Sequence, residues 1–323
     1  MALISIGGLG ISGAYLLHRL KEEGIECQGY DPRPDGFITP CGYAVNWNVF
    51  SGFASRCGLD PDAYLQCRSE SAVFMNDSRR TIRFNTSGLC TIDKNAFVRD
   101  MIGDTVYNRG ILRPGKEGIV IDASGVSRSM LGPCAGDFTM RAVEYIVPGR
   151  EVKDFLFRYF PSGTGYYWEF PMKGYSHIGA GSDDLGRIQR ELSGYSGNRV
   201  LARNIRLSPL FDHLHRGNIV GVGEAIGTVS PITGEGIGPS LESAEILFGI
   251  LKRNEEVDSI MEKYHREINL KFRRFRKLYE LLLKTRQGKL FSPASLGAIS
   301  AVREDFRNFG IDFSLKGLLR SFI

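Results

Sequence analysis

The feature that most constrains this chain is a glycine-rich turn near its N-terminus. Residues 3–6 are an apolar run typical of a buried parallel strand, and Gly7 to Gly13 follow directly. Residues 14–23 then have helical spacing of apolar positions, and residues 25–30 read as a second strand that ends at Asp31. This G-x-G-x-x-G sequence is followed by an acidic residue 18 positions after its last glycine. The pattern predicts a dinucleotide-binding βαβ unit.

The three glycines of this motif have separate physical tasks. Gly8 permits the tight turn, Gly10 lets the backbone approach a pyrophosphate, and Gly13 lets the helix pack closely on the strand. The helix N-terminus favours the phosphate charge, and Asp31 accepts hydrogen bonds from ribose hydroxyls. The alternative is a glycine-rich turn in an α/β domain that binds no nucleotide. The motif alone does not distinguish NAD from FAD.

Two later segments repeat the arrangement of an apolar strand that ends in a glycine-rich turn. The first spans residues 118–134 and contains Asp122 and Gly125. The second spans residues 217–249, and we expect a helix to begin in it near Gly236. Backbone N–H groups at that helix start can hold negative charge that develops on a ring.

With these three segments in this order, the chain resembles the FAD-dependent family that includes aromatic hydroxylases and geranylgeranyl reductases. In that family the first turn binds the FAD pyrophosphate, a D-A-x-G strand end follows, and a late G-D-A…P…G-E-G-I stretch holds the ribityl chain and flavin ring. The resemblance implies FAD binding by Gly8, Gly10, Gly13, Asp31, Asp122, Gly125, Gly223, Glu224, Gly234, Gly236 and Ile237.

Two details of the chain depart from this family pattern. Gly223-Glu224-Ala225 replaces the usual Gly-Asp-Ala, and Glu is one methylene longer than Asp. Only about 22 residues join the helix expected at 93–103 to Gly125, where the family has a longer β insertion. The resemblance therefore describes a trimmed member, with a less certain ribityl contact at Glu224.

Two further motifs favour the geranylgeranyl reductase branch, of archaeal type. Thr39-Pro40-Cys41-Gly42 follows Asp31 closely, and Tyr-Tyr-Trp-Glu-Phe-Pro at 166–171 precedes Gly-Ala-Gly at 179–181. Geranylgeranyl reductases have P-C-G and Y-x-W-x-F-P segments at these relative places, and the resemblance covers roughly residues 1–250. In that family the Cys lies beside flavin and substrate, and the aromatic motif lines the isoprenoid cavity. The resemblance thus assigns catalysis to Cys41 and Gly42, and substrate binding to Tyr166, Trp168, Phe170 and Pro171.

The residues themselves support part of this assignment. Alternation of Tyr166, Trp168 and Phe170 places three aromatic rings on one face of a strand, and such a wall suits a hydrocarbon ligand. The commoner meaning of an aromatic stripe is a packed core. Cys41, between Pro and Gly, is equally compatible with a small residue in a turn, and a reactive thiol needs a positive neighbour.

Metal and disulfide chemistry receive little support from the sequence. The six Cys residues are scattered without C-x-x-C spacing, which favours a reducing, cytoplasmic setting. His213 and His215 stand beside Asp212 but have no further ligand at metal-binding spacing, so no metal is expected. Residues 2–17 are apolar but too short to cross a bilayer, and they lack the features of a signal peptide.

The net charge of +5 is concentrated near the C-terminus. Residues 262–290 hold ten Lys/Arg and three Glu, a net +7, so the other residues sum to −2 and no nucleic-acid partner is expected. Apolar residues recur at steps of three and four over 255–290, which predicts one long helix or a broken pair. Its basic face is either simply solvated or a peripheral contact with an anionic lipid surface.

The sequence therefore predicts an α/β fold with a Rossmann-like FAD-binding domain (1–135 and 213–260). An antiparallel β-sheet substrate domain (136–212) is inserted in it, and a helical region (261–323) follows. The tail is expected to be a helical cap over the substrate side, with apolar residues Leu296, Ile299, Val302, Phe306, Phe309, Phe313, Leu315, Leu318 and Leu319.

The predicted function is FAD-dependent reduction of isoprenoid carbon–carbon double bonds in lipid biosynthesis, with hydride from reduced flavin N5. Electrons would come from NAD(P)H or a ferredoxin-like protein, because no second nucleotide-binding motif is visible. The alternative is an FAD monooxygenase of an aromatic or quinone substrate. A third reading is a flavin- or nucleotide-binding regulator without activity.

Overall fold

The computed structural model describes residues 3–34, 37–76, 78–253, 255–288 and 293–312. Its strands are β1 Ile4–Gly7, β2 Cys27–Tyr30, β3 Ala44–Asn46, β4 Leu65–Arg68, β5 Ser71–Met75, β6 Thr81–Asn85, β7 Leu89–Ile92, β8 Ile119–Asp122, β9 Thr139–Pro148, β10 Phe155–Tyr159, β11 Gly165–Pro171, β12 Tyr175–Ser182, β13 Arg199–Arg206, β14 His215–Arg216 and β15 Ile219–Gly221. Its α-helices are α1 Ile11–Glu22, α2 Trp47–Arg56, α3 Lys94–Ile102, α4 Leu185–Leu192, α5 Ile237–Leu251, α6 Val257–Lys271, α7 Arg273–Arg286 and α8 Pro293–Asn308.

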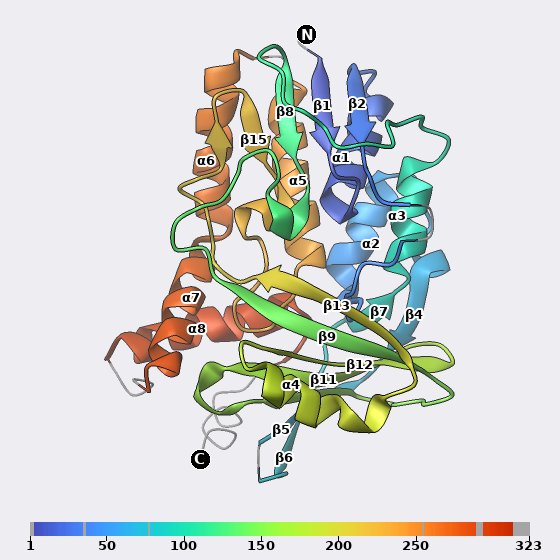
Figure 1. Cartoon of the computed structure of the whole chain (residues 1–323), viewed down its shortest axis with the longest axis vertical. Coiled ribbons are helices and arrows are strands. Elements are labelled where there is room, and N and C mark those ends of the chain that lie inside the picture. Colours follow the sequence, from blue (N-terminus) through green and yellow to red (C-terminus); the bar gives the residue numbers. More distant parts are fainter. Residues whose placement is uncertain (1–2, 35–36, 77, 254, 289–292, 313–323) are drawn as a thin grey trace.

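A five-stranded sheet forms the upper half of the molecule in Figure 1. Its strand order is β14-β15-β8-β1-β2, and all neighbours are parallel except the edge pair β14–β15. Helices α1 and α5 pack against each other beside this sheet, and a second apolar cluster around Val120 and Leu131 covers its other face. Burial on both faces explains why β8 and β15 consist of buried residues throughout. The predicted parallel sheet is therefore confirmed.

The glycine-rich turn brings α1 very close to the first strand. A Cβ atom at Gly13 would lie 1.9 Å from the carbonyl oxygen of Gly8. Gly8 itself has φ +94°, and a Cβ atom there would meet the Ala123 carbonyl oxygen at 2.6 Å. Side chains at either place would push α1 away from β1 and β8, so two of the motif's three glycines are required by packing.

A seven-stranded sheet forms the second layer, in the order β13-β9-β12-β11-β10-β5-β6. The predicted antiparallel strands over 136–212 are present, but the sheet also takes β5 and β6 from outside that range. β10 pairs with β5 in parallel, so the sheet is mixed. The pairing with β5 satisfies the backbone groups at the second edge of β10, whose Phe155 and Phe157 are fully buried. Helix α4 packs on the outer face of the sheet, away from the five-stranded layer.

The basic C-terminal segment forms a broken pair of helices, α6 and α7, that meet at Phe272. Six of its basic side chains have carboxylate partners: Lys263, Arg266, Lys271, Arg274, Arg276 and Arg286. Arg274 is buried rather than part of a solvated face. Among the described residues, no helix is long and apolar enough to span a membrane.

The predicted helical cap is partly within the described residues. α8 packs on α7, and Phe309, just after it, lines the cavity described below. The side chain of Leu296 and the tail positions Phe313, Leu315, Leu318 and Leu319 lie outside the described residues.

We expect Gly13→Ala to lower the free energy of unfolding by about 1–3 kcal/mol, the usual range for overpacking. The reason is the 1.9 Å approach of the new Cβ to the Gly8 carbonyl oxygen. Urea unfolding measures this change. Gly52→Ala is the matched control, because Gly52 is an exposed position within α2 with nothing within 4 Å of a new Cβ. That control should raise stability by up to about 1 kcal/mol; equal effects at both sites would contradict the packing argument.

Candidate active site

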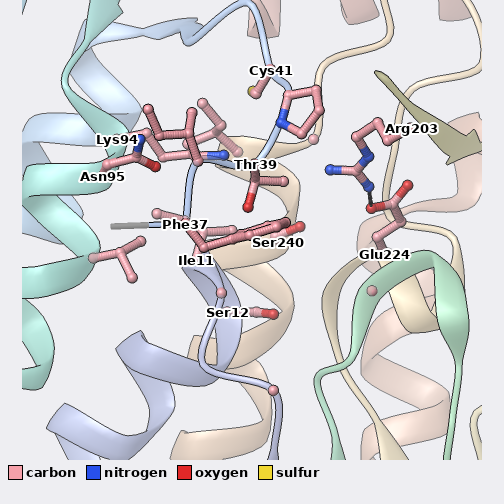
Figure 2. Close-up of a pocket in the computed structure, with 18 of the residues that line it drawn as sticks. Ile11, Ser12, Phe37, Thr39, Cys41, Lys94, Asn95, Arg203, Glu224 and Ser240 are labelled. Carbon is pink, nitrogen blue, oxygen red and sulfur yellow. Dashed lines mark hydrogen bonds and ion pairs between the residues drawn. The ribbon is translucent and has the colours of Figure 1, made fainter. Parts of the chain in front are cut away.

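A large cavity lies where the parallel strands end against the inner face of the seven-stranded sheet. Its volume is about 1460 Å³. One ligand pocket is usually roughly 300–1,000 Å³, so this cavity has room for a dinucleotide and a second molecule. Figure 2 shows its open centre, with Lys94 and Thr39 on one side and Arg203 and Glu224 on the other.

Two helices begin at the cavity wall. Gly10 is the N-cap of α1 and Gly236 is the N-cap of α5, and both residues line the cavity. A Cβ atom at Gly10 would have nothing within 4 Å, so this backbone is open to a ligand. Helix N-termini present unpaired N–H groups and a partial positive charge. This end of the cavity is therefore built to receive an anion such as a pyrophosphate.

Asp31 closes the cavity at the end of β2. Its Oδ2 accepts a hydrogen bond from the Leu9 amide at 2.7 Å, and the Arg33 side chain forms an ion pair with it. Burial alone would raise the pKa of Asp31. The Arg33 guanidinium and the backbone amides of Arg33 and Leu9 stabilise the ionised carboxylate more strongly, and they hold that pKa below its usual value. Asp31 is thus ionised and fixed where a ribose hydroxyl could donate to it.

Glu224 lies in the turn after β15, where the resemblance places a ribityl contact. Its Oε2 forms an ion pair with the Arg203 guanidinium, and its Oε1 accepts a hydrogen bond from the Arg206 amide at 3.0 Å. Figure 2 shows the ion pair between Arg203 and Glu224, and with the Arg206 amide each carboxylate oxygen has a partner. Glu224 thus lines the cavity and holds the Arg203 guanidinium at the cavity wall.

Arg206 joins the two sheets beneath this pair. It is 2% exposed, and its guanidinium donates to the Asp137 carboxylate and to the carbonyl oxygens of Gly125, Val126 and Glu224. These carbonyls belong to the turns that follow β8 and β15, whereas Arg206 ends β13. One buried side chain thus fixes the seven-stranded sheet against the glycine-rich turns.

The aromatic motif forms the opposite wall. Tyr166, Trp168 and Phe170 alternate along β11 and all line the cavity, so the predicted shared face is present. Gly179 pairs with Trp168 across the sheet, and a Cβ there would lie 2.2 Å from the indole ring. The glycine therefore lets the indole lie across β12. Tyr166 donates its hydroxyl to the Thr233 carbonyl at 2.8 Å, which ties this wall to the late glycine-rich loop.

The Cys41–Gly42 segment faces this aromatic wall. A Cβ atom at Gly42 would lie 2.6 Å from the Phe170 ring, so only glycine allows this approach. The Cys41 carbonyl lies 3.1 Å from His177 Nδ1. Tyr43 follows with φ +57°, a left-handed conformation that is unfavourable for a bulky residue, although its side chain is buried. Strain of this kind persists where the surroundings hold it, commonly at functional sites.

Lys94 is a buried cation that lines the same cavity. It begins α3, is 7% exposed, and points into the pocket in Figure 2. Its Nζ lies 5.1 Å from the centre of the Tyr43 ring, and no hydrogen bond or ion pair of Lys94 occurs among the described residues. Burial lowers the pKa of this ammonium group. Lys94 and Arg203 line the same cavity as Cys41.

Most of the residues predicted from the sequence line the cavity: Cys41, Gly42, Gly8, Gly10, Asp31, Gly125, Glu224, Gly234, Gly236, Ile237, Tyr166, Trp168 and Phe170. Four do not, namely Gly13, Asp122, Gly223 and Pro171.

These four residues have structural places behind the cavity wall. Asp122 is fully buried, and its carboxylate accepts hydrogen bonds from the amides of Ser124, Met130 and Leu131. It therefore shapes the turn after β8 instead of facing a ligand. The Gly223 amide donates to Ser243 Oγ, and the Pro171 carbonyl accepts from Thr91 Oγ1.

Sequence reasoning missed several charged residues of the cavity, notably Lys94, Glu144, His177, Arg203 and Glu235. One signal was available for Glu144, because it interrupts the alternating face of β9 that Met140, Ala142 and Ile146 otherwise make apolar. Among the described residues, no group of three or more His, Cys, Asp and Glu side chains is arranged to hold a metal, and the six Cys are free thiols.

Glu235 gives a pH-dependent prediction. Burial raises its pKa well above the ordinary 4.5, with the nearby acids Asp305 and Glu242 adding to the rise. As pH rises above 4.5, the unfolded chain releases this proton while the folded protein keeps it, so stability is lost by up to about 1.4 kcal/mol per pH unit. We expect Glu235→Gln to gain stability relative to the unchanged protein at pH 7 but not at pH 4.

Urea unfolding of both proteins at the two pH values measures this difference. Glu280→Gln, at an exposed position of α7, is the control and should give no pH-dependent change. An offset for Glu235→Gln that is the same at both pH values would show that the buried carboxyl is not the cause.

No protein-family model and no curated protein sequence matches this chain. Solved structures do match over nearly its whole length. A geranylgeranyl bacteriochlorophyll reductase-like protein from Thermoplasma acidophilum has TM-score 0.74 and 16% identity, covering 99% of this chain and 95% of that one. A probable FAD-dependent monooxygenase from Pseudomonas aeruginosa has TM-score 0.66 and 16% identity, covering 93% and 99%.

A third match is a variant of HpxO from Klebsiella pneumoniae in complex with FAD. It has TM-score 0.64 and 15% identity, and the match covers 96% of this chain and 94% of that one. At these identities the likeness concerns the fold. The chain therefore has the mixed α/β fold of FAD-binding oxidoreductases.

Proposed function

We propose that this chain is an FAD-dependent oxidoreductase. The cavity residues fit the cofactor: the open backbone at Gly10 and the N-termini of α1 and α5 suit the pyrophosphate, and Asp31 suits the adenosine ribose. Lys94 adds a buried cation without a carboxylate partner among the described residues. When bound, the flavin would supply the hydride chemistry.

We further propose that the reaction is reduction of isoprenoid carbon–carbon double bonds. The observation that carries this proposal is the wall of Tyr166, Trp168 and Phe170, which faces Cys41 and Gly42 at one end of the cavity. Aromatic rings bind a hydrocarbon chain by apolar contact and exclude water around the double bond. Cys41 and Gly42 would fix the position of that bond, and a lipid biosynthetic role follows from the substrate class.

A second candidate, an FAD monooxygenase of an aromatic or quinone substrate, has one observation in its favour. The same wall contains buried polar atoms without hydrogen-bond partners among the described residues, including Trp168 Nε1 and His177 Nε2. Such atoms suit a substrate that carries oxygen better than a bare hydrocarbon. One of the neighbours in the comparison is a probable monooxygenase.

We also propose an electron donor and a location for the protein. NAD(P)H or a ferredoxin-like protein would reduce the flavin in a cytoplasmic enzyme. A peripheral membrane contact is supported by exposed Leu270 and Leu283 near Arg273, Lys277 and Lys284, for which no ion pair occurs among the described residues. The pairing of the other basic side chains weakens that proposal.

Anaerobic reoxidation tests the proposed reaction. The purified protein, loaded with FAD and reduced by dithionite, should regain its flavin absorbance when a geranylgeranyl lipid is added without oxygen. Mass spectrometry should show two added hydrogens for each reoxidised flavin. Cys41→Ala should slow this step; an unchanged rate would remove the role of Cys41. Oxygen-dependent formation of a hydroxylated product, with no anaerobic reoxidation, would favour the monooxygenase.

Lys94→Met should weaken FAD binding about 10- to 100-fold, the range expected when a charged partner is lost. Lys94→Arg should restore most of the affinity because it keeps the positive charge. Titration of the apoprotein with FAD, followed by flavin fluorescence, measures both dissociation constants. Lys277→Met, at an exposed position of α7, is the control. Equal affinities for Lys94→Met and this control would show that Lys94 does not contact the cofactor.

A further inference from the structure

A carboxyl group lies buried beside the N-terminus of α5, where the cavity wall is built to receive an anion. Glu235 lines the cavity, is 7% exposed and directly precedes Gly236, the N-cap of α5. A Cβ atom at Gly238, in the first turn of this helix, would lie 2.7 Å from Glu235 Oε1. The carboxyl group therefore lies against the helix end that carries a partial positive charge.

The buried acids at this place share one buried cation. Asp305 of α8 is 3% exposed and Arg274 of α7 is 7% exposed, and Arg274 Nε lies 3.5 Å from Asp305 Oδ1. Asp305 also accepts hydrogen bonds from the hydroxyl groups of Ser230 and Thr233. No ion pair of Glu235 occurs among the described residues, because Arg274 is directed to Asp305. Ionisation of Glu235 would therefore bury a charge without a partner, so the neutral acid is its favoured form.

The other charged groups nearby reinforce this preference. The titratable groups near Glu235 are Glu242 of α5, Cys90 of β7, Arg274 of α7 and Asp305 of α8. Burial raises the pKa of Glu235 well above its ordinary value, and the two acids add to the rise while Arg274 opposes it. Glu235 thus keeps its proton at pH values where an exposed carboxyl group is ionised.

The loop before α5 holds Glu235 in this position. The Ser230 amide donates to the Glu235 carbonyl at 2.8 Å, and the Gly234 amide donates to the Ser230 carbonyl at 3.0 Å. Tyr166 of β11 donates to the Thr233 carbonyl, and a Cβ atom at Gly234 would lie 2.5 Å from the Tyr166 hydroxyl oxygen. This fixed backbone keeps the carboxyl group beside the helix end in either charge state.

The charge of this carboxyl group decides how well the helix end can hold an anion. A helix N-terminus carries roughly half of one positive elementary charge. A neutral Glu235 leaves this charge to the ligand, whereas a carboxylate in the same place outweighs it and repels an anionic ligand. Because coupling between two binding events is reciprocal, an anion bound at the helix end must also strengthen the binding of the proton to Glu235.

We propose that protonation of Glu235 strengthens the binding of reduced FAD in this cavity. This inference rests on the proposed FAD-dependent function. Reduced FAD carries negative charge on its pyrophosphate and, when its ring is deprotonated, on the flavin too, so a positive helix end stabilises it. Glu235 acts through the N-terminus of α5 and is therefore a positioning residue. When its carboxylate is ionised, binding of reduced FAD takes up one proton from water.

Anaerobic titration of the apoprotein with dithionite-reduced FAD, followed by tryptophan fluorescence, tests this coupling. The unchanged protein is compared at pH 6, 7, 8 and 9 with Glu235→Gln, which keeps the neutral shape of the protonated acid. The pH dependence of the cofactor itself cancels in the ratio of the two dissociation constants. We expect this ratio to be about 1 at pH 6 and about 10 at pH 9, with Glu235→Gln the tighter binder, within the roughly 5- to 150-fold range usual for such coupling.

Glu280→Gln, at an exposed position of α7, is the matched control and should bind reduced FAD like the unchanged protein at every pH. A ratio for Glu235→Gln that does not change with pH would overturn the inference and leave the proposed function intact. Absence of FAD binding at every pH would remove the proposed function, and this inference with it.

Infrared difference spectra between the unchanged protein and Glu235→Gln observe the proton itself. A carboxylic acid band that the substitution removes should be present at pH 6. In the protein loaded with reduced FAD, this band should persist to higher pH than in the apoprotein. Absence of the band at pH 6, or its loss at the same pH with and without reduced FAD, would contradict the proposed coupling.

Discussion

The structure depends on one buried guanidinium that holds two sheets at a fixed separation. Apolar faces such as the wall of β11 would otherwise close on any neighbouring surface, because burial of that area is favourable. Arg206 resists this by donating to turns of the first sheet while its own backbone belongs to the second. Removing the Arg206 side chain would remove the ion pair with Asp137 and three hydrogen bonds to backbone carbonyls, so the connection is strongly constrained.

This separation lets the cavity contain three chemically distinct regions. Helix N-termini and Lys94 make one region suited to phosphates, and Arg203 with Glu224 makes a charged border. The aromatic wall, against which Gly42 packs, forms the third region. The cavity thus combines a charged border with an aromatic wall.

The sequence predicts the backbone framework of this site better than its charges. Local spacing in the sequence is enough to predict the glycine motif, the two later glycine-rich turns and the alternating aromatic strand. Once the fold is known, their places at the cavity follow. The extension of the second sheet by β5 and β6 depends on a pairing between distant segments, which periodicity does not reveal. The resemblance predicts the position of Glu224 at the cavity, but its ion pair with Arg203 depends on the packing of β13 against the turn after β15, which the sequence does not reveal. The resemblance places Asp122 at the cofactor, and the three turn amides that donate to its carboxylate are not visible in the sequence.

The strand order has a consequence for how the chain is made on the ribosome. The partner of β8 on one side is β15, and most of the second sheet is encoded between them. β5 likewise has no partner on its β10 side until β10 has been synthesised. Each sheet therefore has an unpaired edge until its late strands emerge, and such edges invite pairing with other chains. Nascent chains that stop between β8 and β15 should be clients of chaperones rather than independently folded domains.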